Sequence, residues 1–238
     1  MRYIISDIHG CYDEYISLLN TIHFSEEDEL YVLGDAMDRG PKPIQVVQDL
    51  MRRPNAFYIL GNHDEMFLAV MEKLAVDITE ESLQNLTEDV LADYQHWLLD
   101  GGQETMEGFT KLSHQERADI LDYIRCAYCY ETLEQDGTLY ILVHAGLRGF
   151  EPTKELEEYA VSDFLWERAD YDRRYFPNGR IILVTGHTPT PLIRMDRKPL
   201  IFQENGHIAL DCGCVFGGNL AAYCIETEEC FYSHQAGI

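Results

Sequence analysis

The stretch of the chain with the clearest chemical potential is a glycine-bracketed heptapeptide, Gly34-Asp35-Ala36-Met37-Asp38-Arg39-Gly40. It follows the apolar run 30–33, which predicts a buried strand that ends where the polar residues begin. Buried Asp and Arg side chains are costly unless they are paired or bound to a ligand, and glycines let a backbone approach a ligand closely. One interpretation is a solvated turn with a surface ion pair. The other is a site in which Asp35 bridges two metal ions, Asp38 orients a catalytic histidine and Arg39 binds an anion.

Similar groups of polar residues follow other predicted strands of the chain. These strands span 2–6, 57–60, 138–143 and 181–185, and the residues at their ends are Asp7, His9, Asn62, His63, His144 and His187. A single histidine at the end of an apolar strand is usually a hydrogen-bonded structural residue. Five glycine-flanked strand ends rich in nitrogen and oxygen ligands rarely arise by coincidence. Together they offer the mixed imidazole and carboxylate ligands that suit Mn, Fe, Zn or similar ions.

The predicted order of elements brings these strand ends together. Helical spacing over 12–22, and again from Pro41 and Pro43 to about Arg53, alternates with the first three strands. This alternation predicts a largely parallel sheet with right-handed crossovers, in which ligands bind beyond the carboxyl ends of the strands. Shorter alternating runs predict an antiparallel second sheet, and they lie near 200–203, 207–211, 220–225 and 230–233.

We expect one α/β domain over residues 1–238, a β-sandwich flanked by helices, because a chain of 238 residues fits one domain. From about 64 to 126 the pattern is helical and strongly acidic, with a break at Gly101-Gly102. We interpret this segment as a helical insertion that caps the site. Its charges are expected to form a solvated face rather than a binding surface.

The balance of charge restricts the partners of the protein. A net charge of -24 argues against a general nucleic-acid binder or a protein that binds anionic membranes. Any phosphate site must therefore be locally positive, and bound divalent cations can achieve this. No apolar run approaches the ~20 residues of a membrane span, and the first residues do not form a signal peptide. Seven cysteines without small-domain spacing suggest reduced thiols, so we expect a cytoplasmic protein.

The cysteines allow a second metal hypothesis. Cys126-x-x-Cys129 and Cys212-x-Cys214 could form a four-thiolate zinc site if the fold brought them together. The alternative, which we favour, is that they are small buried apolar residues.

The motifs taken together resemble the calcineurin-like metallophosphoesterase superfamily. The segments that carry the resemblance are Asp7-Ile8-His9-Gly10, Gly34-Asp35-x-x-Asp38-Arg39-Gly40, Gly61-Asn62-His63-Asp64, His144 and Gly186-His187. The Asp-Arg-Gly ending is similar to the phosphoprotein phosphatase family of serine/threonine phosphatases. Residues 97–105, 144–148 and 165–168 resemble its bacterial and phage branch, typified by the phage lambda phosphatase, and the related symmetrical diadenosine tetraphosphatases. Asp64 stands where the family usually has Glu, which leaves its supporting contacts in doubt.

The resemblance implies two divalent metal ions, most simply Mn, with Fe or Zn as alternatives. It implies that the first ion binds Asp7, His9 and Asp35, and that the second binds Asp35, Asn62, His144 and His187. It further implies that His63 is the general acid, that Asp38 orients His63, and that Arg39 and Arg168 bind phosphate oxygens. Asn62 and His63 would also contact the substrate, whereas Arg148 is expected to be a structural or rim residue.

The function we favour from the sequence is a metal-dependent phosphomonoesterase that hydrolyses phosphoserine and phosphothreonine in proteins. The alternative is a symmetrical dinucleoside tetraphosphate hydrolase, because both reactions need the same phosphoryl-transfer machinery. The acidic surface favours a phosphoprotein or small phosphoester over a highly charged nucleotide. A catalytically dead phosphate-binding scaffold would have lost a ligand, and none is missing. The negative charge and the Asp-Arg-Gly motif also argue against a nuclease.

Overall fold

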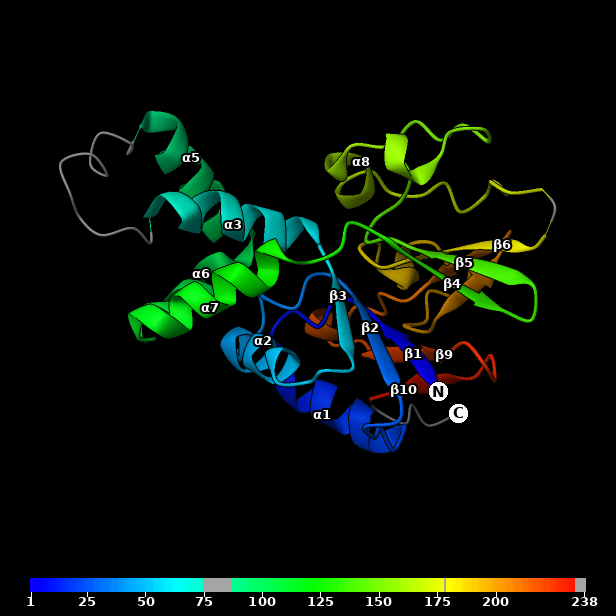
Figure 1. Cartoon of the computed structure of the whole chain (residues 1–238), viewed down its shortest axis with the longest axis horizontal. Coiled ribbons are helices and arrows are strands. Elements are labelled where there is room, and N and C mark those ends of the chain that lie inside the picture. The colour runs from blue at the N-terminus through cyan, green and yellow to red at the C-terminus, as the bar shows by residue number, and fades with distance from the viewer. Residues whose placement is uncertain (75–86, 178, 234–238) are drawn as a thin grey trace.

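Two five-stranded mixed sheets stack face to face at the centre of the computed structural model, which describes residues 1–74, 87–177 and 179–233 (Figure 1). The first sheet has the order β10-β9-β1-β2-β3, with bounds Cys230–Tyr232, Ala221–Cys224, Arg2–Ile5, Glu29–Leu33 and Ala56–Ile59. The second has the order β4-β5-β6-β8-β7, with bounds Glu131–Gln135, Thr138–Leu142, Ile181–Thr185, His207–Ala209 and Phe202–Glu204. This sandwich confirms the expected α/β class.

Each sheet combines three parallel strands with two strands that pair antiparallel. Strands β1, β2 and β3 pair in parallel in the first sheet, as do β5, β6 and β8 in the second. Strands β9 and β10 complete the first sheet, and β4 and β7 form the edges of the second, all by antiparallel pairing. Because the parallel strands end at the same edge, the loops after β1, β2, β3, β5 and β6 can meet there.

One prediction about the second sheet was wrong, and one of its strands was not predicted. The four C-terminal runs do not form one antiparallel sheet, because β7 and β8 join the second sheet and β9 and β10 join the first. Asn205-Gly206 makes a local hairpin, whereas the segment through Gly217 carries the chain from one sheet to the other. Strand β4 was not predicted, although Asp136-Gly137, both with positive φ, is a typical hairpin turn to β5.

Apolar side chains cover both faces of the first sheet, as buried parallel strands require. Ile4 and Leu33 pack between the two sheets, while the alternate residues Ile5 and Val32 face the helices. Helices α1 (Tyr12–Thr21) and α2 (Pro43–Met51) cover that outer face. The outer face of the second sheet is covered by α8 (Val161–Leu165). Short 3-10 turns lie at η2 (Leu156–Glu158), η3 (Thr190–Leu192) and η4 (Cys214–Phe216).

The segment expected to be a helical insertion consists of helices that extend to one side of the sandwich (Figure 1). These are α3 (Asn62–Leu74), α5 (Glu88–Trp97), α6 (Gln103–Phe109) and α7 (His114–Arg125), while residues 75–86 lie outside the described part. Thr87 caps α5, and Ser113 with Glu116 forms a capping box on α7. A widened turn, η1 (Leu98–Gly102), joins α5 to α6 through Gly101 at φ 110°.

No helix within residues 1–74, 87–177 and 179–233 combines the length and the apolar character needed to cross a membrane.

Phe67 anchors the insertion to the rest of the fold. Its ring is fully buried and contacts the rings of Trp97 and Phe109, which come from two other helices. We predict that Phe67→Ala lowers the free energy of unfolding by about 3–5 kcal/mol, because the truncation leaves a cavity in a close-packed cluster. Urea denaturation measures this, with Leu99→Ala, at an 85% exposed position, as the control. A loss below about 1 kcal/mol for Phe67→Ala would show that the ring is not a structural anchor.

Candidate metal centre

The predicted site residues meet at the edge of the sandwich where the parallel strands end. They occupy the loops after β1, β2, β5 and β6 and the first turn of α3. Many of them have a left-handed backbone, which non-glycine residues rarely adopt and which concentrates at functional sites. Six of the eleven such residues in the described part are predicted site residues: Asp7, His9, Asp35, Asp38, Arg39 and His187. Gly10 allows two of the loops to touch, since a Cβ there would lie 2.8 Å from the carbonyl oxygen of Gly40.

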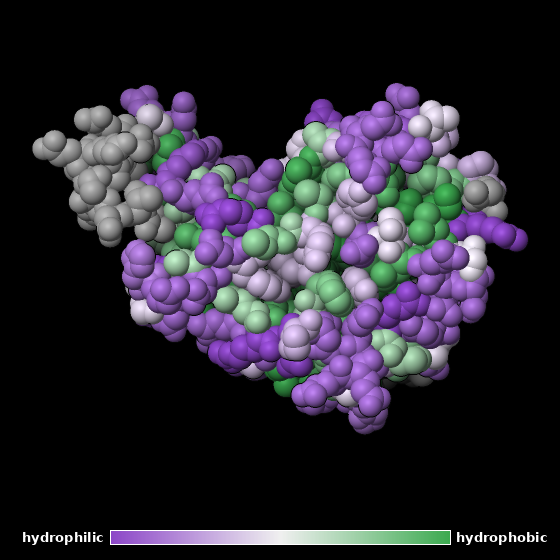
Figure 2. Space-filling view, in the orientation of Figure 1, coloured by the Kyte–Doolittle hydropathy of each residue, from purple (hydrophilic) through white to green (hydrophobic). Residues whose placement is uncertain are grey.

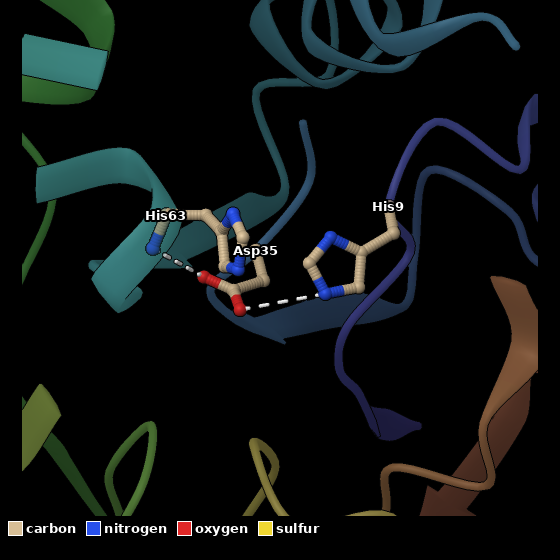
Figure 3. Close-up of side chains that lie close together, drawn as sticks. All are labelled: His9, Asp35 and His63. Carbon is tan, nitrogen blue, oxygen red and sulfur yellow. Dashed lines mark hydrogen bonds and ion pairs between the residues drawn. The ribbon is translucent and has the colours of Figure 1, made fainter. Parts of the chain in front are cut away.

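Asp35 lies at the centre of the cluster. Its Oδ2 is 3.5 Å from Nε2 of His9 and 3.5 Å from Nε2 of His144. Its Oδ1 accepts a hydrogen bond from the backbone N–H of His63 at 3.0 Å (Figure 3). Asp35 therefore belongs to both groups of residues in the described part that could hold a metal ion, one with His9 and His63 and one with His144 and His187.

Backbone carbonyls fix the tautomers of two histidines. Nδ1 of His9 donates to the carbonyl oxygen of Met37 at 2.8 Å, and Nδ1 of His144 donates to that of Leu33 at 2.7 Å. Burial, reinforced by a neighbouring histidine, lowers the pKa of both His9 and His144 well below its usual value. Each ring is therefore neutral and directs the lone pair of Nε2 into the cluster, as metal-ligating histidines do.

Asn62 supplies the clearest sign that the site fits a cation. Its Oδ1 is 2.9 Å from Nε2 of His144 and 2.9 Å from Nδ1 of His187. Nε2 of His144 has no proton to donate in the tautomer described above, so it and the amide oxygen present lone pairs to each other. A divalent cation would satisfy both facing lone pairs at once. Mixed oxygen and imidazole donors are also a suitable set for Mn, Fe or Zn.

The pKa shifts of the buried acids and of His187 are also consistent with a cation site. Burial, and then repulsion from Asp7, raises the pKa of Asp35 well above its usual range. Burial, and then repulsion from Asp211, does the same to the pKa of Asp7. Burial and the charge of Arg168 lower the pKa of His187 to about 4. Bound cations would favour the ionised carboxylates and the neutral imidazoles, so the His/Asp clusters are consistent with a dinuclear metal site.

Asp7 lies beside these two groups and belongs to neither of them. Its Oδ2 accepts hydrogen bonds from the backbone N–H of His187 at 2.9 Å and from the hydroxyl of Ser6. His63, which was predicted as the acid, lies in the first group instead.

His63 and Asp38 form the expected pair. Nδ1 of His63 donates to Oδ2 of Asp38 at 2.8 Å, and both side chains are buried. Nε2 of His63 is buried without a hydrogen-bond partner, and His63 lines the cavity beside the cluster. The insertion completes the pair, because Trp97 Nε1 and Thr105 Oγ1 donate to the Asp38 carboxylate at 2.8 and 2.6 Å. Asp38 is thus held by donors from three segments.

The three predicted arginines occupy different positions. Arg39 places Nη1 2.9 Å from Nε2 of His9 and Nη2 3.1 Å from Oδ1 of Asp100, and its backbone N–H donates to the carbonyl of Gly101. Arg168 is exposed and lines the same cavity as Arg39. Arg148 instead pairs with Glu167 at 3.5 Å, on the surface, as expected for a rim residue.

Asp64 stabilises two loops of the site by hydrogen bonds, although its side chain is shorter than that of Glu. Its Oδ2 accepts from the backbone N–H groups of Asp35 at 3.1 Å and Gly61 at 2.9 Å, and from the hydroxyl of Tyr58 at 2.8 Å. These bonds tie the loop of Asp35 to the turn before Asn62. Burial raises the pKa of Asp64 to about 6.

Several residues around the site were given no role in the sequence analysis. They are Trp97, Asp100, Thr105 and Asp211, and Asp211 is buried and lines the cavity. The break at Gly101-Gly102 was the sequence signal that could have indicated Trp97, Asp100 and Thr105. Asp211 follows strand β8, just as the predicted site residues follow their own strands. The proposed four-cysteine site does not form, since neither metal-capable group in the described part contains a cysteine and all seven cysteines are free.

Asp211 makes the stability of the metal-free protein depend on pH. Burial raises its pKa to about 6, from about 3.9 in an unfolded chain. The folded state therefore retains a proton that the unfolded state loses, and this contribution to stability disappears as pH rises through 6. We predict that Asp211→Asn becomes more stable than the original protein by up to about 3 kcal/mol between pH 4 and pH 7. Urea unfolding in chelator measures it, and exposed Asp119→Asn should show no such trend. A difference independent of pH would contradict the prediction.

Comparison with known proteins relates this geometry to a family. The family model for calcineurin-like phosphoesterases matches residues 3–226. The chain is 30% identical over 246 residues to the asymmetrical bis(5'-nucleosyl)-tetraphosphatase PrpE of Geobacillus sp. (strain WCH70), covering 92% of this chain and 88% of the relative. It is 28% identical over 264 residues to the symmetrical bis(5'-nucleosyl)-tetraphosphatase of Erwinia tasmaniensis, covering 96% and 95%.

A crystal structure provisionally described as a diadenosine tetraphosphatase shares the fold. It superposes with a TM-score of 0.65 at 20% identity, covering 97% of this chain and 91% of the other. The family model spans nearly the whole chain, and the sandwich and the cluster of carboxylate and imidazole ligands agree with it. The chain therefore belongs to the calcineurin-like phosphoesterase family.

Proposed function

We propose that the protein is a metal-dependent hydrolase of dinucleoside tetraphosphates. The observation that carries this proposal is that relatives matched over more than nine-tenths of the chain are bis(5'-nucleosyl)-tetraphosphatases. This favours the alternative of the sequence analysis over the protein phosphatase that was preferred there. The preference rested on the acidic surface, but net charge acts over the whole molecule. At the site itself, Arg39 and Arg168 provide local positive charge, and bound cations would add to it.

The ligands of the two cations are those that the resemblance implied. Asp35 would serve both cations, His9 and Asp7 would complete the first set, and Asn62, His144 and His187 would make up the rest of the second. The facing lone pairs of Asn62 and His144, and the position of Asp35 between His9 and His144, support this division. When bound, two such cations supply Lewis acidity to the phosphoryl group and lower the pKa of a coordinated water.

The other side chains of the site bind the substrate and move protons. Arg39 and Arg168 hold phosphoryl oxygens, a task suited to their planar donors. Nε2 of His63 has no hydrogen-bond partner and His63 lines the cavity, so this ring can protonate the departing oxygen. Asp38 accepts the Nδ1 proton of His63 and so fixes the ring, while Trp97 and Thr105 hold Asp38 in place. Binding, positive charge and proton transfer are thus divided among separate residues.

The proposal is tested by substrate preference. The manganese-loaded protein is given diadenosine tetraphosphate and a panel of phosphoserine, phosphothreonine and phosphotyrosine peptides side by side. We expect the dinucleotide to have the higher kcat/KM and turnover to cease on chelation, because the buried carboxylates need the cations. Products of two ADP mean symmetrical cleavage, and ATP with AMP means asymmetrical cleavage. Faster hydrolysis of any phosphopeptide would overturn the proposal.

The role of His63 is tested by the leaving group. An acid that protonates the departing oxygen matters most when that oxygen is strongly basic. We predict that His63→Asn lowers kcat on phenyl phosphate by about 10²-fold or more, and on p-nitrophenyl phosphate by much less. His96→Asn, at an exposed position in α5, is the control. An equal loss on both esters would assign His63 to metal or phosphate binding instead.

A further inference from the structure

The cavity beside the candidate metal centre is lined by two kinds of residue. Its volume is about 640 Å³, within the range of pockets that take whole organic ligands and larger than a single phosphate needs. One kind is the polar residues already described. The other is a set of apolar residues, here called the apolar wall: Pro189, Pro191, Leu192, Pro199 and Phe216. Figure 2 shows the molecule hollowed between the insertion helices and the region of α8, with hydrophobic and hydrophilic surface side by side.

Phe216 is the exposed aromatic group of this wall. Its side chain is 69% exposed, although it follows the buried Cys214 in the short turn η4. Glycines on either side make the turn tight, because Gly213 and Gly217 are left-handed. A Cβ on Gly218 would lie 2.0 Å from the carbonyl oxygen of Cys212. The ring is therefore held out from a closely packed loop, and binding to it would need little further ordering.

Polar contacts brace the same loop. The backbone N–H of Gly213 donates to Oδ1 of the buried Asp211 at 2.9 Å, and that of Phe216 donates to the carbonyl of Gly213 at 3.0 Å. The loop that carries Phe216 is thus hydrogen-bonded to Asp211, a polar residue that lines the cavity.

Arg39 connects the ring to the polar cluster. Its guanidinium carbon is 5.7 Å from the centroid of the Phe216 ring, while its Nη1 is 2.9 Å from Nε2 of His9. A phosphate held by Arg39 beside Asp35 would therefore leave its organic substituent next to Phe216. The wall offers flat ring and aliphatic surface with few hydrogen-bonding groups. A nucleobase has a flat π-face that can stack on an aromatic ring, and such stacking tolerates every base.

We propose that Phe216, with Leu192 of the same cavity lining, forms a nucleobase subsite: the base of the nucleoside attached to the Arg39-bound phosphate stacks on the Phe216 ring. This deepens the proposed function and rests on it. The subsite selects a nucleotide over a bare phosphate chain, and it does not discriminate between purine bases.

The experiment compares two ligands that share a diphosphate group, ADP and pyrophosphate. Their affinities for the manganese-loaded protein are measured by isothermal titration calorimetry with matched manganese in cell and syringe. We expect ADP to bind about tenfold more tightly than pyrophosphate, a difference typical of one stacked base. Phe216→Ala should abolish this difference and leave the affinity for pyrophosphate unchanged. Phe216→Trp should retain it. Tyr128→Ala, which removes a half-exposed ring that lines neither large cavity, should change nothing.

The outcomes separate this inference from the proposed function. Equal binding of ADP and pyrophosphate by the original protein, or an equal loss of both in Phe216→Ala, overturns the subsite even if diadenosine tetraphosphate is hydrolysed. The opposite combination of outcomes separates the two proposals as well. A base-dependent preference that Phe216→Ala removes supports the subsite, and failure to hydrolyse the dinucleotide would then overturn the proposed function alone.

Discussion

The structure depends on a cluster of buried carboxylate, amide and imidazole groups whose mutual contacts are unfavourable. Asp35 is buried with Asp7 close enough to raise its pKa, and His144 and Asn62 direct lone pairs at each other across 2.9 Å. Several of the loops that hold these groups have a left-handed backbone, which is strained for non-glycine residues. The surrounding sheets and helices must stabilise this arrangement. That requirement explains why the loops are braced by Asp64 and Tyr58 from beneath.

The helical insertion is part of the site rather than a cover for it. Trp97 and Thr105 bond to the carboxylate of Asp38, and the carbonyl of Gly101 accepts the backbone N–H of Arg39. Gly101 also touches Arg39 so closely that a Cβ there would lie 2.5 Å from Cγ of the arginine. Loosening of the insertion would therefore disturb both the hydrogen-bonded pair of His63 and Asp38 and the position of Arg39. This couples the packing around Phe67 to the chemistry of the cavity.

The net charge of the whole molecule and the charged groups in the cavity affect binding in different ways. Over the whole molecule, 42 acidic residues outnumber 18 basic ones, which disfavours nucleic acid as a partner. Within the cavity, Arg39 and Arg168 supply local positive charge. At a Debye length of about 10 Å the distant acidic surface is largely screened, so the local groups decide what binds. The apolar wall at Phe216 adds the proposed preference for a nucleobase, which the net charge does not predict.

The amino-acid sequence by itself determined the sandwich class, the helical nature of the segment after β3 and the family, because these depend on local periodicity, glycines and short motifs. It also determined that Asp35, His9 and Asn62 stand at strand ends, where a parallel sheet brings them together. Their roles as ligands stay predictions. Tertiary structure alone decided that β9 joins β1, that Trp97 reaches Asp38 and that Phe216 faces Arg39. These contacts join residues from 59 to more than 200 positions apart in the chain, and no local pattern specifies where a connecting segment will cross between sheets.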